Sequence, residues 1–85
     1  MPIHVRLLTV KDALVLDRVA PDVFDHALDA HWTHEFLNDP RHHLAVALDG
    51  TTVVGIASAV HYVHPDKPPT LWINEVGVAS SHLRQ

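Results

Sequence analysis

Apolar residues at every second position open the chain. Ile3, Val5 and Leu7 share one side of an extended segment over residues 3–10, which predicts a half-buried first strand. Thr9 stands three residues before Asp12, which is the spacing of a capping box. We therefore expect a short helix to begin there and to run to about Val19.

The pattern then changes to a helical period. Ala20-Pro21 interrupts the first helix, and from Asp22 onward the aromatic and aliphatic residues stand four apart, at Phe24, Leu28, Trp32 and Phe36. This spacing predicts one amphipathic helix whose apolar stripe packs into the core, with Ala27 and His31 beside it. A ligand pocket along Trp32 and Phe36 is the alternative to core packing. Asn38-Asp39-Pro40 predicts its end, because the residue before a proline is pushed out of the helical region.

Three strands are predicted in the second half. They cover residues 43–49, 51–63 and 71–78, with a hairpin turn at Asp49-Gly50 and a proline-rich loop over 64–69. Both faces of 51–63 are small or apolar, as in a central strand that is covered on two sides. In the last strand, strict alternation separates two sets, Leu71, Ile73, Glu75 and Gly77 against Trp72, Asn74, Val76 and Val78. Glu75 is thus an acid within an otherwise apolar strand.

Composition narrows the class of protein. A chain of 85 residues with 47% hydrophobic and 19% charged residues predicts one globular domain. A net charge of −4 with scattered cations gives no footprint for nucleic acid and suits small cationic ligands better. No segment matches a membrane span or a signal peptide, and cysteine is absent, so we expect a cytoplasmic protein that does not bind a membrane.

The end of the chain carries a resemblance. "NEVGVASSHLRQ", preceded by a hairpin and two amphipathic helices, resembles the GNAT superfamily of acetyl-CoA-dependent N-acetyltransferases. The stretch from "FLNDP" to "NEVGV" is most similar to the gentamicin-type aminoglycoside 3-N-acetyltransferases. The resemblance covers essentially the whole chain. It implies an α+β (α/β) fold, the N-terminal half of the acyl-CoA N-acyltransferase fold, with β-α-α-β-β-β order and a mostly antiparallel sheet.

The resemblance also implies roles for residues. Glu75 matches the acid that takes a proton from the substrate ammonium, and its alternative is an acid hydrogen-bonded into the sheet. Val76, Gly77 and Val78 match the strand backbone that binds the acetyl group and pantetheine arm of acetyl-CoA, and ordinary sheet pairing is the alternative there. Arg84 and Gln85 match the two positions before the first glycine of the pyrophosphate loop, a helix-terminus anion site. Residues 1–85 are therefore expected to form a single truncated domain that ends just before this Gly-x-Gly loop.

Other polar residues suggest weaker hypotheses. Six acids could line a cleft for a polycationic amine, and their alternative is a set of solvated helix faces and caps: Asp22, Asp25, Asp29, Glu35, Asp39 and Asp66. Asp66, in the loop before the last strand, is the substrate-binding candidate among them. Nine histidines raise the question of a metal. Their pairs, at His31/His34, His42/His43 and His61/His64, match no specific zinc signature, so we expect no metal site.

Two interpretations remain open at this stage. The first is an enzyme that transfers acetyl from acetyl-CoA to a primary amine, aminoglycoside-like or another small cationic amine. The second is a non-catalytic half-domain that self-associates. An exposed apolar edge strand is a template for pairing, so this second interpretation predicts a homodimer or a higher oligomer built on Leu71–Val78.

Overall fold

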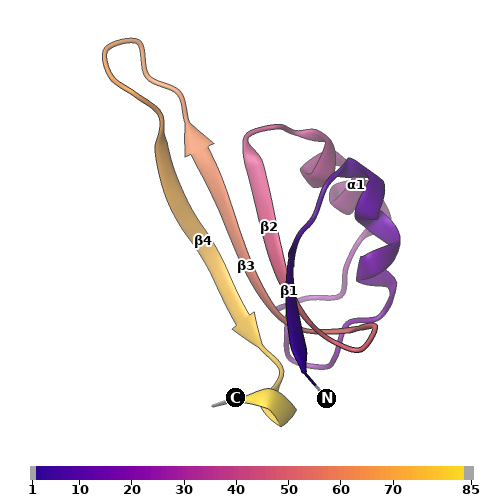
Figure 1. Ribbon diagram of the computed structural model, residues 1–85. Helices are drawn as coiled ribbons and strands as arrows, with labels where there is room; N and C mark the ends of the chain where they lie inside the picture. Colours follow the sequence, from indigo (N-terminus) through magenta and orange to yellow (C-terminus); the bar gives the residue numbers. More distant parts are fainter. Residues whose placement is uncertain (1, 84–85) are drawn as a thin grey trace.

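The computed structural model describes residues 2–83 as one four-stranded sheet with helical segments on one face (Figure 1). The strands are antiparallel and lie in chain order, β1-β2-β3-β4. Their bounds are β1 Ile3–Leu7, β2 His42–Asp49, β3 Thr52–Tyr62 and β4 Thr70–Val78. The helical segments are η1 Val10–Asp17, α1 Ala30–Asn38 and η2 Ser80–His82. The predicted α+β class and the order of its elements are confirmed.

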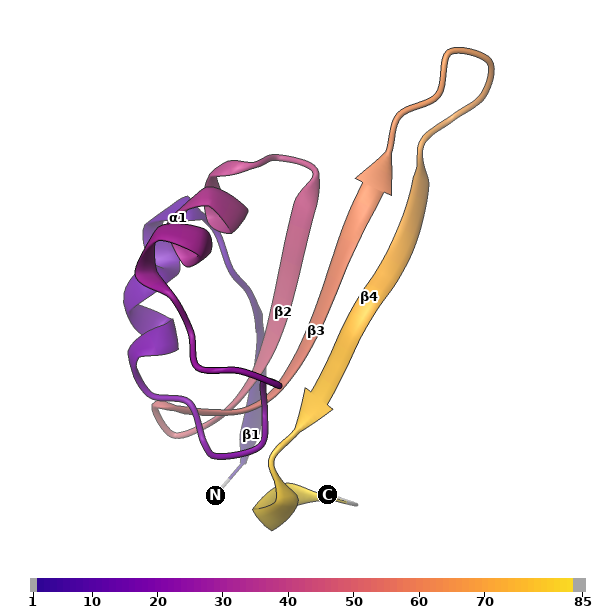
Figure 2. The same ribbon diagram turned by 180° about the vertical axis from the view of Figure 1, so that it is seen from behind.

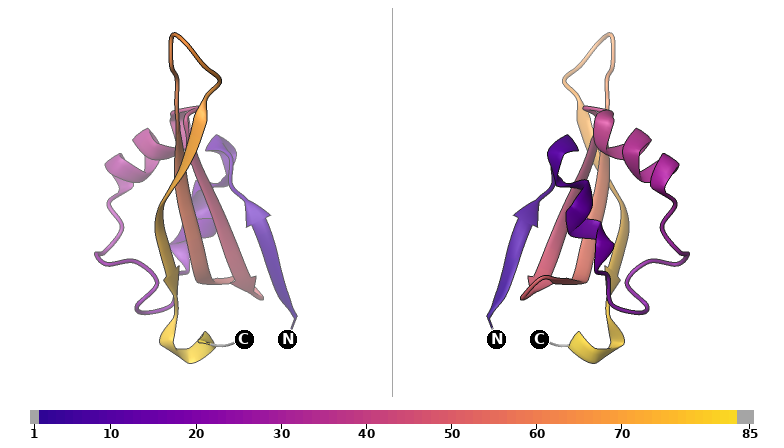
Figure 3. Two further views of the ribbon diagram at one scale, coloured as in Figure 1. Left: turned by 90° about the vertical axis from the view of Figure 1, so that its left-hand side faces the viewer. Right: turned by 90° about the vertical axis from the view of Figure 1, so that its right-hand side faces the viewer.

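The core lies between the sheet and its helical layer. Figure 2 looks onto the face that η1, α1 and the segment joining them cover, and Figure 3 shows α1 standing to one side of the sheet. The side chains buried there come from η1, the joining segment, β2, β3 and the end of β4, and they include Leu16, Val23, Leu44, Val46, Val53 and Ile56. The other face of the sheet carries no helix within residues 2–83 (Figure 1).

The prediction that β1 is half-buried, which came from the alternation of its residues, is wrong. All five residues of β1 are exposed, and Val5 keeps 77% of its surface. The cause is the register, which sets Val5 opposite Ala47 and Leu7 opposite Ala45. Residues directly opposite in an antiparallel pair share a face. The apolar side of β1 therefore belongs to the face of the sheet that carries no helix.

The capping box is confirmed, but the element it begins is a 3-10 helix. The Thr9 side chain accepts a hydrogen bond from the Lys11 N–H, and the Asp12 carboxylate accepts one from the Thr9 N–H at 2.7 Å. The helix ends at Asp17 rather than near Val19. Beyond it, the Val53 N–H donates to the Arg18 carbonyl at 2.8 Å and the Ala20 N–H to the Val53 carbonyl at 2.9 Å. The backbone there pairs with β3, which ends the helix.

The prediction of a long second helix is wrong over its first eight residues. Residues 22–29 form an irregular segment, and α1 covers only Ala30–Asn38. Asp22 has a φ of 70°, a left-handed conformation that breaks a helix. Asp29 then caps α1 by accepting a hydrogen bond from the Trp32 N–H at 2.9 Å. Phe24 and Leu28 thus leave the stripe that their spacing predicted.

The strands of the second half are confirmed with two irregularities. Gly50, with a φ of 62°, lies in the predicted turn between β2 and β3. β3 is mostly buried, although no helix covers its second face within the described residues. Bulges interrupt the register near Ala47/Leu48 and near Ser58/Ala59. The 63–69 loop projects beyond the sheet (Figure 1).

No helix of residues 2–83 has the length and apolar character to span a membrane.

Candidate active site

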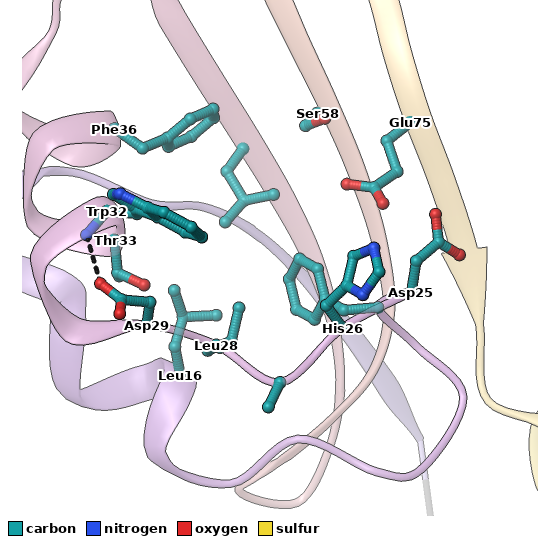
Figure 4. A pocket seen from close by; sticks show the side chains of 13 residues that line it. Leu16, Asp25, His26, Leu28, Asp29, Trp32, Thr33, Phe36, Ser58 and Glu75 are labelled. Atoms are coloured by element: carbon teal, nitrogen blue, oxygen red, sulfur yellow. Dashed lines mark hydrogen bonds between the residues drawn. The ribbon is translucent and has the colours of Figure 1, made fainter.

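A pocket of about 290 Å3 opens between β4, the 24–29 segment and the first turns of α1 (Figure 4). Its lining is predominantly apolar. In Figure 4 the side chains of Glu75, Asp25 and His26 gather on one wall, while Trp32 and Phe36 form the opposite wall. Leu16 and Leu28 lie below, and Ser58 lies on β3 beside Glu75. The site thus has an acidic side and an aromatic side.

A bulge in β4 decides which way Glu75 points. Ser58 pairs with Glu75, but the next residue of β3, Ala59, pairs with Ile73, so Asn74 is the extra residue. A bulge interrupts the two-residue alternation of a strand. Glu75 and Gly77 consequently share the helix-covered face with Trp72, while Ile73, Val76 and Val78 lie on the other face. The prediction from strict alternation that Ile73 and Glu75 share a face is therefore wrong.

Glu75 is half-buried and faces the pocket from the strand. The acids that form ion pairs within residues 2–83 are Asp12, Glu35, Asp39 and Asp49. No hydrogen bond from the described part of the chain reaches the Glu75 carboxylate, so the alternative of an acid bonded into the sheet finds no support there. Its neighbour across the strand pair, Ser58, is 8% exposed.

The 20–29 segment brings Asp25 and His26 to Glu75. It is held to β3 by the Ala20–Val53 hydrogen bond, and Val23 is buried in the core at 3% exposure. The segment then crosses β4 at Gly77, so closely that a Cβ on Gly77 would lie 1.9 Å from the Val23 carbonyl oxygen. Glycine is the residue that permits such a backbone approach. The sequence argument counted Asp25 among several acids that could line a cleft, but it placed Asp25 and His26 on a helix and did not connect either residue with Glu75.

The aromatic wall also departs from the prediction. Trp32 was expected in the core, yet 72% of its surface is exposed and its ring borders the pocket. Phe36 is half-buried and stacks on His42, with ring centroids 4.8 Å apart. Residues 22–29 are not helical, so Phe24 and Leu28 do not form a continuous helical stripe with Trp32. The capping role of Asp29 is the signal in the sequence that pointed to this later helix start.

The residues matched to the acetyl-CoA site lie along the end of β4. Val76, Gly77 and Val78 pair with Ala57, Ile56 and Gly55 of β3. The opposite edge of β4 has no strand partner within residues 2–83, so its outward backbone groups are free to bind an extended ligand. Arg84 and Gln85 lie outside the described residues.

Asp66 lies away from this site. It is exposed in the 63–69 loop at the projecting tip of the β3-β4 hairpin (Figure 1), and it does not line the pocket. The structure therefore does not bring Asp66 to Glu75.

The histidines do not converge on one point. His43 and His61 face each other with ring nitrogens 2.9 Å apart, and His82 lies 2.8 Å from the Asp49 carboxylate. His31, which was expected to pack beside the apolar stripe, is exposed and 3.9 Å from Glu35. Within residues 2–83, no three His, Asp or Glu side chains are grouped as metal ligands.

Hydrogen bonds lower the pKa values of two acids at turns, Asp12 and Asp39. The Thr9 backbone N–H lowers the pKa of Asp12, with help from the Thr9 hydroxyl and from Arg6. Hydrogen bonds from the Arg41 side chain and backbone lower the pKa of Asp39 from its ordinary value of 3.8 to about 2. Both acids stabilise turns, at the start of η1 and after α1.

Comparison with known proteins gives the fold. No family model and no curated protein matches the sequence. Solved structures do match it: an aminoglycoside acetyltransferase from an uncultured soil metagenomic sample (TM-score 0.78, 14% identity), a ribosomal-protein-alanine N-acetyltransferase from Brucella melitensis (0.73, 14%) and a GNAT family acetyltransferase from Staphylococcus aureus (0.76, 14%). All of this chain is covered in each match.

The matched structures are longer than this chain, which spans 63% of the first two and 68% of the third. The chain thus has a partial GNAT acyl-CoA N-acyltransferase fold, and the resemblance seen in the sequence is confirmed at the level of fold. Enzymes described for aminoglycosides and for a ribosomal protein share this fold, so it does not select the amine. The gentamicin-type 3-N branch stays a prediction.

Proposed function

We propose that this chain carries the amine-binding side of an acetyl-CoA-dependent N-acetyltransferase. The observation that carries the proposal is the half-buried Glu75, which faces a pocket from β4 beside the strand backbone that the family resemblance matches to acetyl-CoA. The pocket, with Asp25 on the same wall, suits a small cationic amine, of the aminoglycoside type or another primary amine.

The reaction is a direct acyl transfer. An ammonium ion loses a proton to Glu75, directly or through one water, and the amine nitrogen then attacks the acetyl carbonyl carbon. The C–N bond forms as the C–S bond breaks, and the products are an acetamide, the free thiol of coenzyme A and one proton. General-base catalysis of this kind contributes about 10²–10⁴ in rate.

The end of β4 supports the binding of acetyl-CoA. Outward N–H groups along Val76–Val78 have no strand partner within residues 2–83 and can donate hydrogen bonds to carbonyl oxygens of the acetyl group or pantetheine arm. Arg84 and Gln85 remain candidates for the diphosphate by resemblance alone.

The first test is binding of acetyl-CoA. We expect calorimetric titration to show binding below millimolar cofactor, and amide NMR shifts to concentrate on Val76, Gly77 and Val78. Ile3–Leu7, on the opposite edge of the same sheet, serve as the internal control. No heat up to millimolar acetyl-CoA would overturn the proposal for this chain.

The second test is release of thiol from acetyl-CoA in the presence of an amine. Glu75→Gln is expected to lower the rate by about 10²–10⁴ if Glu75 is the base. Glu35→Gln is the matched control, because Glu35 is exposed on α1 and does not line the pocket. Equal losses in the two variants would contradict the role of Glu75.

A second candidate function is self-association without catalysis. It is favoured by the free edge of β4 and by the apolar residues that stay exposed on that strand, among them Leu71, Ile73 and Val76. A homodimer or higher oligomer paired through β4 is then expected in light scattering at micromolar concentrations. A stable monomer would exclude it.

We place the protein in the cytoplasm as part of the same proposal. The lack of cysteine fits a reducing compartment, and the net charge of −4 argues against nucleic acid or an anionic membrane as partners.

A further inference from the structure

The pocket is small and has two chemically different walls. Its volume of about 290 Å3 lies at the lower end of the roughly 300–1,000 Å3 usual for small-molecule sites. Glu75, Asp25 and His26 form one wall, and Trp32, Phe36 and Leu28 belong to the apolar part (Figure 4). A ligand that satisfies both walls needs a polar head and an apolar body.

The acidic wall favours a ligand with a positively charged group. Neither Asp25 nor Glu75 forms an ion pair within residues 2–83, and no Lys or Arg of that range lines the pocket. Two arginines form ion pairs with other acids: Arg6 pairs with Asp12 at 2.6 Å, and Arg41 pairs with Asp39 at 3.2 Å. Two carboxylates without a protein cation favour one ammonium group between them.

The aromatic wall calls for a ring or a compact apolar group. The backbone of Trp32 is fixed at the start of α1, because its backbone N–H donates to the Asp29 carboxylate, yet 72% of the Trp32 surface remains exposed. A tryptophan side chain offers a large apolar surface and a face that attracts cations and stacks on rings. A ligand ring between Trp32 and Phe36 would cover this surface.

The same features disfavour a polycationic sugar. A ligand with several ammonium and hydroxyl groups needs hydrogen-bonding partners on most sides. Here Glu75, Asp25 and His26 supply such partners on one wall. On the Trp32 side the polar lining consists of Thr33 and the Asp29 carboxylate, which already accepts a hydrogen bond from the Trp32 backbone N–H. Asp66, the acid expected to extend the cleft, lies in the loop of the β3-β4 hairpin and does not line the pocket. A hydroxyl-rich ring against Trp32 and Phe36 would lose water without replacement.

We propose that the amine bound by this site is a small monocation with one aromatic or compact apolar body, of the size of 2-phenylethylamine, rather than an aminoglycoside. The ammonium lies between Glu75 and Asp25, and the ring lies against Trp32 and Phe36. The inference rests on the proposed function for its acetyl transfer, but the binding itself is measured without acetyl-CoA.

The test is equilibrium binding of four probes to the chain, followed by NMR or by tryptophan fluorescence. We expect 2-phenylethylamine to bind about tenfold tighter than 2-phenylethanol, which lacks the charge, and than methylamine, which lacks the ring. Kanamycin, a polycationic aminoglycoside, is expected to bind more weakly than 2-phenylethylamine. Tighter binding of kanamycin, or of 2-phenylethanol, would overturn the proposal.

Matched variants locate the site. Trp32→Ala is expected to weaken 2-phenylethylamine about tenfold, while Trp72→Ala leaves the affinity unchanged because Trp72 is exposed on β4 and does not line the pocket. Glu75→Gln should reduce the preference for the amine over the alcohol. Circular dichroism checks that each variant is folded. Equal effects of the two tryptophan variants would contradict the assignment.

The two proposals fail differently. If 2-phenylethylamine binds as expected but acetyl-CoA gives no product and no heat, the acetyltransferase proposal fails and the assignment of the pocket stands. If kanamycin is acetylated and 2-phenylethylamine is neither bound nor acetylated, the acetyltransferase proposal stands and the choice of amine is wrong.

Discussion

Gly77 is the residue on which the geometry of the pocket depends most directly. The 20–29 segment passes over it, and two positions earlier in the same strand Glu75 faces Asp25 and His26, which that segment carries. A side chain at position 77 would push the segment outward. The geometry of the pocket and the stability of the fold therefore depend on the same small residue.

We expect Gly77→Ala to destabilise the fold by about 1–3 kcal/mol, because the new Cβ would overlap the Val23 backbone and force the segment to move. The affinity for a small amine should fall with it. Gly55→Ala is the matched control, since its Cβ would meet its nearest atoms at 3.4 and 3.5 Å, an ordinary contact. Urea denaturation compares the two variants, and equal stabilities would contradict the close crossing.

At the scale of elements, short capping turns decide where the helical segments begin and end. Thr9 and Asp12 begin η1, Asp29 begins α1, and Asp39 follows the end of α1. The Asp39 N–H donates to the Phe36 carbonyl at 3.3 Å, and the Asp39 carboxylate accepts from the Arg41 backbone N–H at 2.9 Å. Asp39 thus connects the last turn of α1 to the start of β2.

The lowered pKa of Asp39 predicts that the stability of the fold depends on pH. The pKa of Asp39 is lowered from 3.8 to about 2, mainly by the hydrogen bond from the Arg41 side chain. A lowered pKa in the folded state stabilises the fold above the ordinary value, and this contribution is lost as the pH falls from about 4 through 2. The carboxyl carbon of Asp39 should titrate near 2 in NMR and nearer 3.8 in Arg41→Ala.

The same reasoning applies to stability. Arg41→Ala is expected to lower the melting temperature at pH 6 and to have little effect near pH 2, where Asp39 is half protonated or more. The pair is exposed, so added salt should weaken the effect at pH 6. A loss of the same size at both pH values would show that the charge of Asp39 is not its cause.

At the scale of the whole molecule, the two faces of the sheet differ. One face is covered by η1, α1 and the segment between them, and the other presents Val5, Leu7, Ile73 and Val76 without a helical cover within residues 2–83. Exposed apolar surface of this extent is typical of an interface. Ile73 and Val76 lie on β4, beside its free edge within the described residues, whereas Val5 and Leu7 lie on β1 at the opposite edge of the sheet.

If the chain self-associates, the charge placed by Val76→Lys should raise the dissociation constant by more than about tenfold, because 68% of the Val76 surface is exposed on that face. Leu14→Lys is the control, since Leu14 is 80% exposed on η1. Sedimentation velocity measures both variants. Equal effects would place the interface elsewhere.

Much of the fold was predictable because local signals and the final structure agree. The hairpin at Asp49-Gly50, the capping box at Thr9 and the order of strands follow from turn chemistry and periodicity. Glu75 was singled out as an acid in an apolar strand, and the structure sets it at a pocket. The pocket itself was not predictable, since Asp25, His26 and Trp32 were assigned to a continuous helix.

The sequence by itself determined the strands, the hairpin turn and the start of η1, because caps, turns and alternation act over a few neighbouring residues. Tertiary structure decided which side chains meet. The bulge at Asn74 sets Glu75 on the covered face, and the segment that carries Asp25 crosses β4 at Gly77. The bulge depends on the pairing of β4 with β3, and the crossing brings Val23 against Gly77, 54 positions later in the chain. Contacts between residues that are distant in the sequence override local helical preference.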